Sequence, residues 1–174
     1  MNIQTLLNKA NKILVNSSSK SPKLDSEILL SEAINKNRQY LILNSNEELL
    51  KENIKSFDHL LKRRKRGEPI AYLVKKKEFW KQNFYINKNV LIPRPDTELL
   101  VEETLKLFNV NSKLNILDIG TGSGCILLSI LKERRNFFGT GIDISKKAIN
   151  VARFNAKMHQ LSNRVKFYNS DVDK

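Results

Sequence analysis

Glycine is concentrated in one short stretch of this 174-residue chain, and that stretch constrains the fold more than any other feature. Five of the six glycines lie between Gly120 and Gly141, whereas the first 66 residues contain none. Around the stretch, short apolar runs alternate with longer segments of helical spacing. The pattern predicts strands at 115–119, 137–142 and 165–168, with helices at 124–134 and 145–160. Strands that alternate with helices of this length form parallel βαβ units, so an α/β sheet is expected here.

The first 66 residues are expected to form a small helical bundle. Apolar residues recur at helical spacing from Ile3 to Leu14. Ser21 and Pro22 predict the start of a second helix, with serine as the N-cap and proline in the first helical position. Ser45 and Glu48 have the spacing of a capping box, which predicts a third long helix from that point, after a short helical piece at 40–43.

The middle of the chain predicts a β-hairpin. Short aromatic and β-branched runs at 78–80, 83–86 and 90–92 are separated by Asn and Lys, and helical spacing resumes at 97–108. The chain is therefore divided into a helical domain at 1–66, a hairpin connector at 67–96 and an α/β segment at 97–174.

The charge of the chain is strongly positive, a property that often accompanies binding to phosphate backbones. The net charge of +13 is spread as +6 in residues 1–66, +1 in 67–111 and +6 in 112–174, and Lys supplies 22 of the 31 positive charges. Because abundant Lys, Asn and Ile also arise from an AT-rich coding sequence, charge alone is weak evidence for a nucleic-acid partner.

The location is predicted from three features of the sequence. No apolar run approaches the roughly 18 to 20 residues that a membrane span needs. The first residues lack the apolar block and cleavage site of a secretory signal. Cys125 is the single cysteine, so an internal disulfide is impossible. A cytoplasmic protein with no membrane partner is expected.

The segment Asp118-Ile119-Gly120-Thr121-Gly122-Ser123-Gly124 is the strongest candidate site. It lies where a strand is expected to end and a helix to begin. Its alternating glycines permit positive φ and close approach of a ligand, and the following helix start offers backbone N–H groups to an anion. The spacing is not the Gly-x-Gly-x-x-Gly of dinucleotide sites. An acidic residue directly before the loop is typical of sites that bind the methionine end of S-adenosylmethionine.

Two further carboxylates are expected at the same edge of the sheet. Asp143 ends the second strand, 23 residues after Gly120, where a carboxylate can accept both ribose hydroxyls. Asp171 follows the third strand, near the expected position of an adenine. Three acidic residues at three successive strand ends predict a cofactor site for S-adenosyl-L-methionine. His59 and His159 have no metal-ligand spacing, so no metal site is expected.

Three further blocks carry a family resemblance: Gly67-Glu68-Pro69-Ile70-Ala71-Tyr72, Glu78-Phe79-Trp80, and Val90-Leu91-Ile92-Pro93-Arg94-Pro95-Asp96-Thr97-Glu98. Together with the glycine loop, they resemble the signature blocks of the peptide-chain release-factor glutamine methyltransferases, the HemK/PrmC family. That family methylates the side-chain amide of the glutamine in the Gly-Gly-Gln motif of bacterial-type release factors. The resemblance covers the whole chain and implies the first three strands of a class I, Rossmann-like methyltransferase domain.

The resemblance also implies roles for individual residues. The methionine moiety of the cofactor is expected at Gly120, Thr121, Gly122, Ser123 and Gly124, beside Asp118. The ribose is expected at Asp143, and the adenine at Asp171 and Val172. The helical domain would grip the release factor, and 93–98 would border the pocket. Two positions depart from the family pattern: Val172 is smaller than the usual bulky residue, and Lys75 replaces a frequent glycine.

The family's catalytic motif, Asn-Pro-Pro-Tyr, does not occur in the 174 residues. No catalytic residue is therefore assigned, the chain alone is expected to be inactive, and the strand at 115–119 is expected to lie at an exposed sheet edge. Two alternatives remain: a non-catalytic module that binds the cofactor or the release factor, and a nucleic-acid amino-methyltransferase. The block at 93–98 and the helical domain favour the protein substrate.

Overall fold

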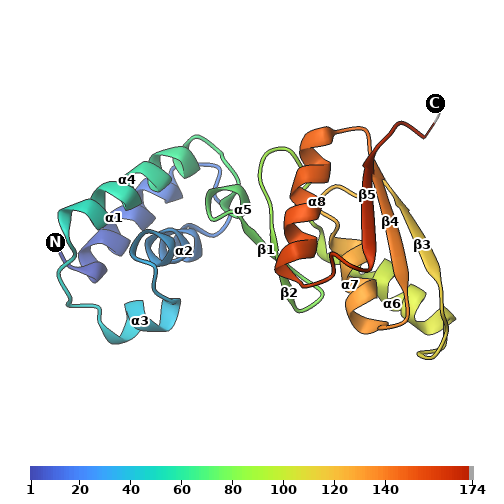
Figure 1. Ribbon diagram of the computed structural model, residues 1–174. Helices are drawn as coiled ribbons and strands as arrows, with labels where there is room; N and C mark the ends of the chain where they lie inside the picture. Colours follow the sequence, from blue (N-terminus) through green and yellow to red (C-terminus); the bar gives the residue numbers. More distant parts are fainter. Residues whose placement is uncertain (173–174) are drawn as a thin grey trace. The chain divides into compact units, whose positions relative to one another are not determined.

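The structure is a computed structural model that describes residues 1–172. The chain divides into two compact units, Met1–Val74 and Lys75–Lys174 (Figure 1). The first unit is helical, and the second contains a hairpin and a three-stranded parallel sheet with its helices. Among the helices of residues 1–172, none is long and apolar enough to cross a bilayer.

The first unit confirms the predicted helical bundle. Its helices are α1 (Ile3–Val15), α2 (Pro22–Ile34), α3 (Arg38–Leu43), α4 (Lys51–Lys65) and the single-turn α5 (Ile70–Leu73). Pro22 is the first residue of α2, as predicted, although the Ser21 side chain makes no capping hydrogen bond within the described chain. The core is formed by side chains from all five helices, among them Ile3, Leu6, Leu14, Leu29, Leu30, Leu41, Phe57, Leu61 and Leu73.

The predicted capping box at Ser45 and Glu48 is wrong, because α4 begins only at Lys51. Residues 45–49 instead run beside the start of α1. The Ile3 N–H donates to the Glu47 carbonyl at 3.1 Å, and the Gln4 N–H donates to the Ser45 carbonyl at 2.9 Å. The first N–H groups of a helix have no partner within the helix, so this segment satisfies two of them from outside.

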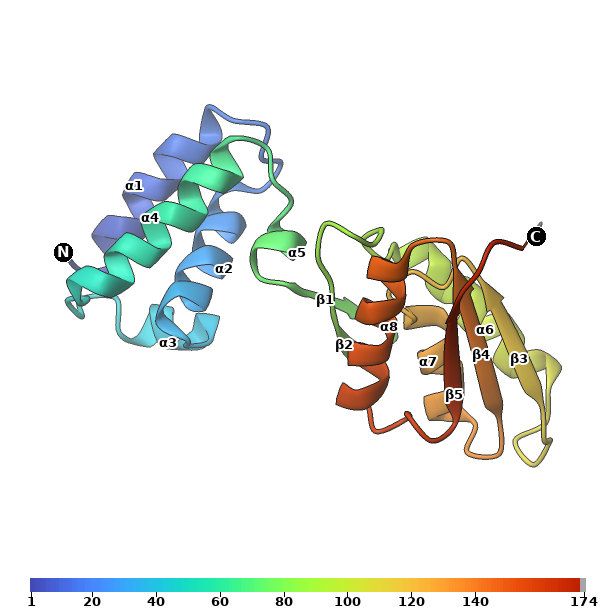
Figure 2. The same cartoon turned by 45° about the horizontal axis from the view of Figure 1, so that its top comes forward.

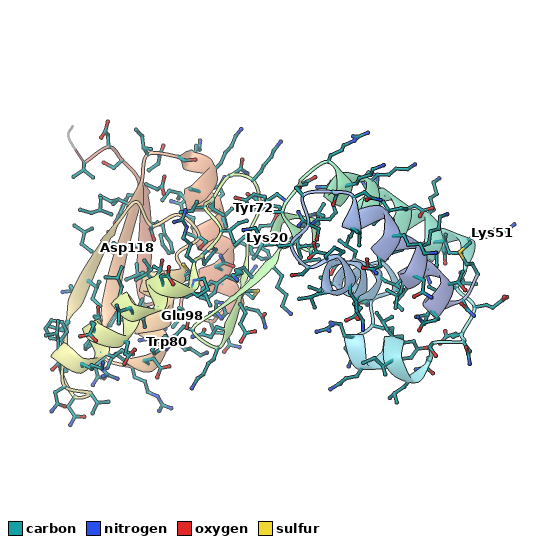
Figure 3. All side chains as sticks on the ribbon, turned by 180° about the vertical axis from the view of Figure 1, so that it is seen from behind. Lys20, Lys51, Tyr72, Trp80, Glu98 and Asp118 are labelled. Atoms are coloured by element: carbon teal, nitrogen blue, oxygen red, sulfur yellow. The ribbon has the colours of Figure 1, made fainter. Side chains whose placement is uncertain are left out.

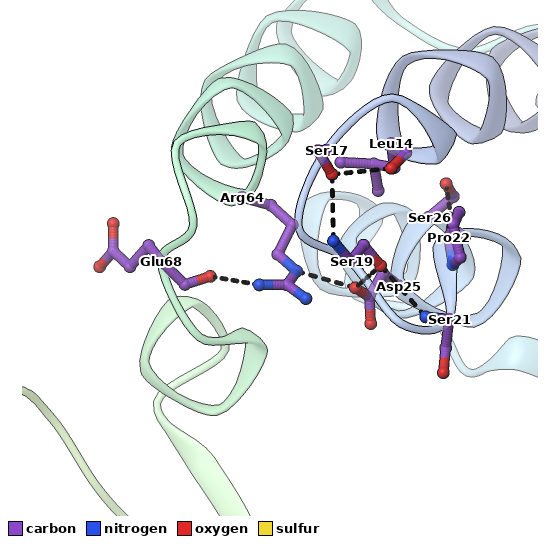
Figure 4. A network of polar contacts seen from close by, with 9 residues as sticks. All are labelled: Leu14, Ser17, Ser19, Ser21, Pro22, Asp25, Ser26, Arg64 and Glu68. Atoms are coloured by element: carbon purple, nitrogen blue, oxygen red, sulfur yellow. Dashed lines mark hydrogen bonds and ion pairs between the residues drawn. The ribbon is translucent and has the colours of Figure 1, made fainter.

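A buried ion pair joins α2 to α4 inside the first unit (Figure 4). Arg64 Nε donates to Asp25 Oδ2 at 2.7 Å, and the exposed fractions of the two side chains are only 14% and 10%. The hydroxyl of Ser19 donates to the same carboxylate oxygen, and Arg64 also donates to the Glu68 carbonyl. The pair therefore has the additional hydrogen bonds that a buried charge requires.

The second unit begins with an antiparallel hairpin of β1 (Lys76–Phe79) and β2 (Gln82–Tyr85). The predicted hairpin is confirmed, but its third run, 90–92, is not a strand. The tight turn consists of Trp80 and Lys81, whose φ angles are +49° and +58°. Two positive φ angles match the right-handed twist of the strands, a geometry that usually selects Asn and Gly. Propensity therefore did not identify this turn.

Lys75, the residue before β1, has a φ of +51°. This left-handed conformation costs a side-chain-bearing residue about 1–2 kcal/mol, whereas glycine adopts it freely. A Lys75→Gly substitution is therefore expected to raise the free energy of unfolding by about 0.5–1 kcal/mol, after allowance for the greater chain entropy of glycine. Urea unfolding measures this change. Lys76→Gly, in β1, is the control and should lower stability, so a loss at both positions would contradict the assignment of strain to Lys75.

The rest of the second unit is an α/β arrangement. A 3₁₀ turn, Pro95–Thr97, leads into α6 (Glu98–Leu107), followed by β3 (Asn115–Ile119), α7 (Cys125–Glu133), β4 (Phe138–Asp143), α8 (Lys146–Met158) and β5 (Val165–Asn169). All three strands are parallel, in the order β3-β4-β5. The predicted parallel sheet is confirmed, and the bounds of β3 agree with the prediction to the residue.

One face of this sheet is covered and the other is open. Helices α7 and α8 pack on the strands, and α6 packs on α7 (Figure 2). On the opposite face, side chains more than half exposed include Leu117, Ile119, Phe138 and Tyr168. Within residues 1–172, β3 pairs only with β4, so it lies at the sheet edge, as expected. Parallel sheets are normally covered on both faces, which makes this surface unusual.

Candidate functional site

The glycine loop, defined as residues 120–124, connects the end of β3 to the start of α7. The N–H groups of Gly120 and Thr121 both donate to the Ile142 carbonyl of β4, at 2.9 and 3.0 Å. Gly124 is the N-cap of α7 with a φ of +78°, and a Cβ on it would lie 3.1 Å from Leu128. Left-handed backbone and close helix contact together explain the glycine at this position.

Two carboxylates are tied to the loop by short hydrogen bonds. The Thr121 hydroxyl donates to Asp118 Oδ2 at 2.7 Å. Asp143, the last residue of β4, accepts from the Gly122 N–H at 2.9 Å and from the Ser145 N–H at 2.8 Å. The structure thus brings together two of the three predicted carboxylates, and each carboxylate oxygen retains a lone pair for a ligand.

Four N–H groups of the glycine loop are bonded within the protein. The N–H groups of Gly120, Thr121 and Gly122 are bonded as described, and the Gly124 N–H donates to the Thr121 carbonyl at 2.8 Å. The loop is therefore held in shape by the protein itself. What it presents to a ligand is chiefly negative charge, from Asp118 and Asp143.

Burial raises the pKa of Asp118 above its ordinary value; the hydrogen bond from Thr121 opposes this shift, and the nearby charge of Asp143 adds to it. A cation bound between the two carboxylates would offset the cost of desolvating the charged Asp118 and the repulsion between the two charges. In a chain with a net charge of +13, this concentrated negative site favours a cationic ligand over an anionic one.

The end of β5 reaches the same edge of the sheet. The side-chain amide of Asn169 donates to the carbonyls of Asp143 and Ile144, at 2.9 and 2.8 Å. The predicted residues Asp171 and Val172 follow two and three positions later; Asp171 is half-buried, and the side chain of Val172 is 56% exposed. The hydrogen bonds named above link the third strand end to Asp143, but they do not extend to Asp171 or Val172.

Cys125, the residue after the loop, is a packed side chain. It is 8% exposed, and burial raises the pKa of its thiol to about 11. A thiol with so high a pKa is protonated at neutral pH and is a poor nucleophile.

Two residues that shape the site were missed by sequence reasoning. Gly141, in β4, makes room for the Thr121 hydroxyl, since a Cβ there would lie 2.9 Å from Thr121 Oγ1 and 2.6 Å from the Phe167 ring. Asn155, in α8, donates to the Ser123 carbonyl of the loop at 2.8 Å. The concentration of five of the six glycines in 120–141 could have indicated a special role for Gly141. The sequence around Asn155 contains no comparable signal.

Two of the sequence blocks that suggested the family contact each other in the structure. The Trp80 N–H, in the hairpin turn, donates to Glu98 Oε1 at 3.0 Å (both residues are labelled in Figure 3). The indole of Trp80 also donates to Glu133 Oε1, at the end of α7, at 2.9 Å. The hairpin turn is thereby attached to both α6 and α7.

Comparison with known proteins assigns both units. Residues 5–74 match the model of the PrmC N-terminal domain, and residues 110–174 match a methyltransferase domain. A release factor glutamine methyltransferase of Coxiella burnetii is 42% identical over 153 residues, which cover 88% of this chain and 55% of that protein. The chain therefore contains a PrmC N-terminal domain followed by a methyltransferase domain. This is the domain order expected from the sequence.

The curated relatives are longer than this chain. A bifunctional methyltransferase of Rickettsia typhi is 39% identical over 187 residues, which cover 97% of this chain and 36% of that protein. The chain thus spans about half, or less, of the curated relatives it matches. The solved structure of an RNA methyltransferase from Salinibacter ruber aligns with 48% of this chain and 52% of that chain, at 28% identity and a TM-score of 0.42.

Proposed function

We propose that the chain forms the S-adenosyl-L-methionine-binding part of an enzyme that methylates the glutamine of the Gly-Gly-Gln motif in peptide-chain release factors. The observation that carries the proposal is the pair of carboxylates, Asp118 and Asp143, held at adjacent strand ends by the glycine loop. The PrmC-type domain order and the relatives named release factor glutamine methyltransferase support the substrate. The activity is assigned to the cytoplasm, where peptide chains are released.

The residues at the strand ends fit the cofactor chemically. S-adenosyl-L-methionine supplies a methyl group on a positively charged sulfur, and its methionine end also carries an ammonium group. Asp118 would accept hydrogen bonds from the ammonium group. Two backbone N–H groups fix the orientation of Asp143, which would accept hydrogen bonds from the ribose hydroxyls. Asp171 and Val172 would lie beside the adenine. The loop residues Gly120 to Gly124 would cover the methionine end.

The first unit is assigned to recognition of the release factor. Its supporting observation is the match of residues 5–74 to the PrmC N-terminal domain. Methyl transfer breaks the sulfur–carbon bond, forms a bond to the glutamine amide nitrogen and releases an amide proton. Groups that accept the amide hydrogens are needed for this step. The 174 residues contain no Asn-Pro-Pro-Tyr sequence, and we assign them no such group.

The purified 174-residue chain is therefore expected to bind S-adenosyl-L-methionine without transferring its methyl group. Calorimetric titration measures binding, and incubation of labelled cofactor with a release factor measures transfer. Binding without transfer supports the proposal. Absence of binding would overturn the cofactor site, and transfer by this chain would overturn the assignment of catalysis to other residues. Labelling of adenine in DNA or RNA, with none in the release factor, would favour the nucleic-acid alternative.

Binding of the cofactor is expected to depend on pH through Asp118. Because the pKa of this carboxyl is raised in the folded chain, acid removes its charge before it would in a free aspartate. Affinity should fall about tenfold for each pH unit below that pKa, since one proton then competes with the ammonium group. Titration from about pH 4.5 to 8 checks this. Asp118→Asn should bind weakly at every pH, so an unchanged pH profile in that variant would contradict the assignment.

The stability of the unliganded chain should depend on pH in the opposite sense. A carboxyl with a higher pKa in the folded state than in the unfolded state binds more protons when folded. The contribution of Asp118 to stability therefore becomes less favourable as pH rises through the interval between the two pKa values. Urea unfolding of the wild type and of Asp118→Asn across this interval separates that contribution from those of other groups.

A further inference from the structure

Asn155 is a polar side chain in the middle of α8 whose exposed fraction is zero. Its Oδ1 accepts the Tyr85 N–H at 2.8 Å, and its Nδ2 donates to the Tyr85 carbonyl at 2.9 Å and to the Ser123 carbonyl at 2.8 Å. An amide group has two N–H donors, and both are used here. A buried amide whose two N–H donors and carbonyl oxygen are all hydrogen-bonded holds its partners in fixed positions.

The bond to Ser123 fixes one particular peptide unit of the glycine loop. The Ser123 carbonyl and the Gly124 N–H belong to the same peptide group. Asn155 holds the carbonyl side, and the Thr121 carbonyl accepts the N–H side at 2.8 Å. Because Gly124 has a φ of +78° and lacks a Cβ, this peptide can rotate more easily than most. Asn155 therefore restrains a peptide group whose rotation Gly124 would otherwise permit.

The bonds to Tyr85 connect the same side chain to the hairpin. Tyr85 is the last residue of β2, and its N–H and carbonyl are both satisfied by Asn155, as they would be by a neighbouring strand. Two ring contacts reinforce this connection. The ring centroids of Tyr85 and Phe154 are 4.8 Å apart, and those of Phe84 and His159 are 4.7 Å apart. One amide side chain thus joins the backbone of the hairpin to the backbone of the glycine loop.

We infer that Asn155 is a positioning residue for cofactor binding, which sets the Ser123–Gly124 peptide of the glycine loop and couples it to the hairpin. The inference rests on the proposed function, because the ligand of the loop is the cofactor assigned there. Asn155 acts through Ser123, and the cofactor contacts are left to Asp118, Asp143 and the loop itself.

The test compares Asn155→Leu with Phe84→Leu, a control at the same hairpin–α8 interface. Phe84 is fully buried against Phe79 and His159, so its truncation weakens the interface without removing the bond to Ser123. At a temperature where each variant is folded, Asn155→Leu is expected to weaken binding of S-adenosyl-L-homocysteine about tenfold or more, since a buried carbonyl loses its partner. Phe84→Leu should change the affinity less than about twofold.

Hydrogen exchange gives a second readout that needs no ligand. Asn155→Leu should accelerate exchange of the amides of residues 122–125 beyond what its loss of global stability explains, and Phe84→Leu should not. If Asn155→Leu does not fold, Asn155→Asp replaces it, since a carboxylate can still accept the Tyr85 N–H but cannot donate to Ser123. Equal effects of the Asn155 and Phe84 variants on the loop would overturn the inference. Failure of the wild type to bind S-adenosyl-L-homocysteine would overturn the proposed function instead, and exchange would still decide the role of Asn155.

Discussion

A Gly141→Val chain is expected to lose cofactor binding and about 3 kcal/mol of the stability of its second unit. Gly141 lies opposite Phe167 in the β4–β5 register. A Cβ alone at this position would lie 2.6 Å from two carbons of the Phe167 ring and 2.9 Å from Thr121 Oγ1, closer than real side chains approach. Valine adds two further methyl groups to that space. Thr121 must then move, and its hydrogen bond to Asp118 is lost with it.

Urea unfolding and titration with S-adenosyl-L-homocysteine measure the two effects of Gly141→Val. Thr140→Val is the matched control, because Thr140 is the preceding residue of β4, points to the opposite face of the sheet and is half-buried. It should change stability by less than about 1 kcal/mol and leave the affinity intact. A Gly141→Val chain with the unfolding midpoint of the wild type would show that the space beside Thr121 is not limiting.

Removal of Arg64 is expected to have an effect of similar size in the first unit. Arg64→Met leaves the Asp25 carboxylate buried without its cation, which costs about 3–5 kcal/mol. The double variant Asp25→Leu/Arg64→Met removes both charges and should recover most of this loss, because an apolar pair of similar volume needs no compensation. Far-UV circular dichroism during urea unfolding follows the helices of both units, and the fluorescence of Trp80, the single tryptophan, identifies the transition of the second unit.

Arg63→Met is the control for the Arg64 variant. Arg63 is the preceding residue of α4 and pairs with Glu68, but each of these side chains is about one third exposed. A pair accessible to solvent contributes about 1 kcal/mol or less. Equal losses at the two positions would indicate that burial does not distinguish the pairs, and a double variant no more stable than Arg64→Met would contradict the role of Asp25.

The order of elements in the second unit was predictable because each element has a local signal. The run from Asn115 to Ile119 is apolar, short and bounded by loops, and the structure has β3 at the same residues. The glycine loop was identified because positive φ and close approach leave few alternatives to glycine. Asp118 and Asp143 were brought together by a general property of parallel sheets, whose carboxyl ends share one edge.

The remaining features depend on contacts between residues distant in sequence. Ser45 and Glu48 have the spacing of a capping box, but their segment pairs with the first residues of the chain, and no local pattern reveals that. The role of Asn155 was hidden for the same reason: its partners are backbone atoms of Tyr85 and Ser123, 70 and 32 positions away. The turn at Trp80 and Lys81 was missed because these residue types rarely adopt positive φ.

The strand order of the sheet has a consequence for synthesis of the chain. In the part of the chain that the structure describes, β4 pairs with β3 and β5 pairs with β4, so spatial order equals chain order. When β4 and then β5 leave the ribosome, the strand with which each pairs has therefore already been made. The glycine loop and Asp143 can come together once β4 and the start of α8 have emerged. The carboxylate pair can thus assemble before β5 is translated, in the vectorial order in which domains fold during translation.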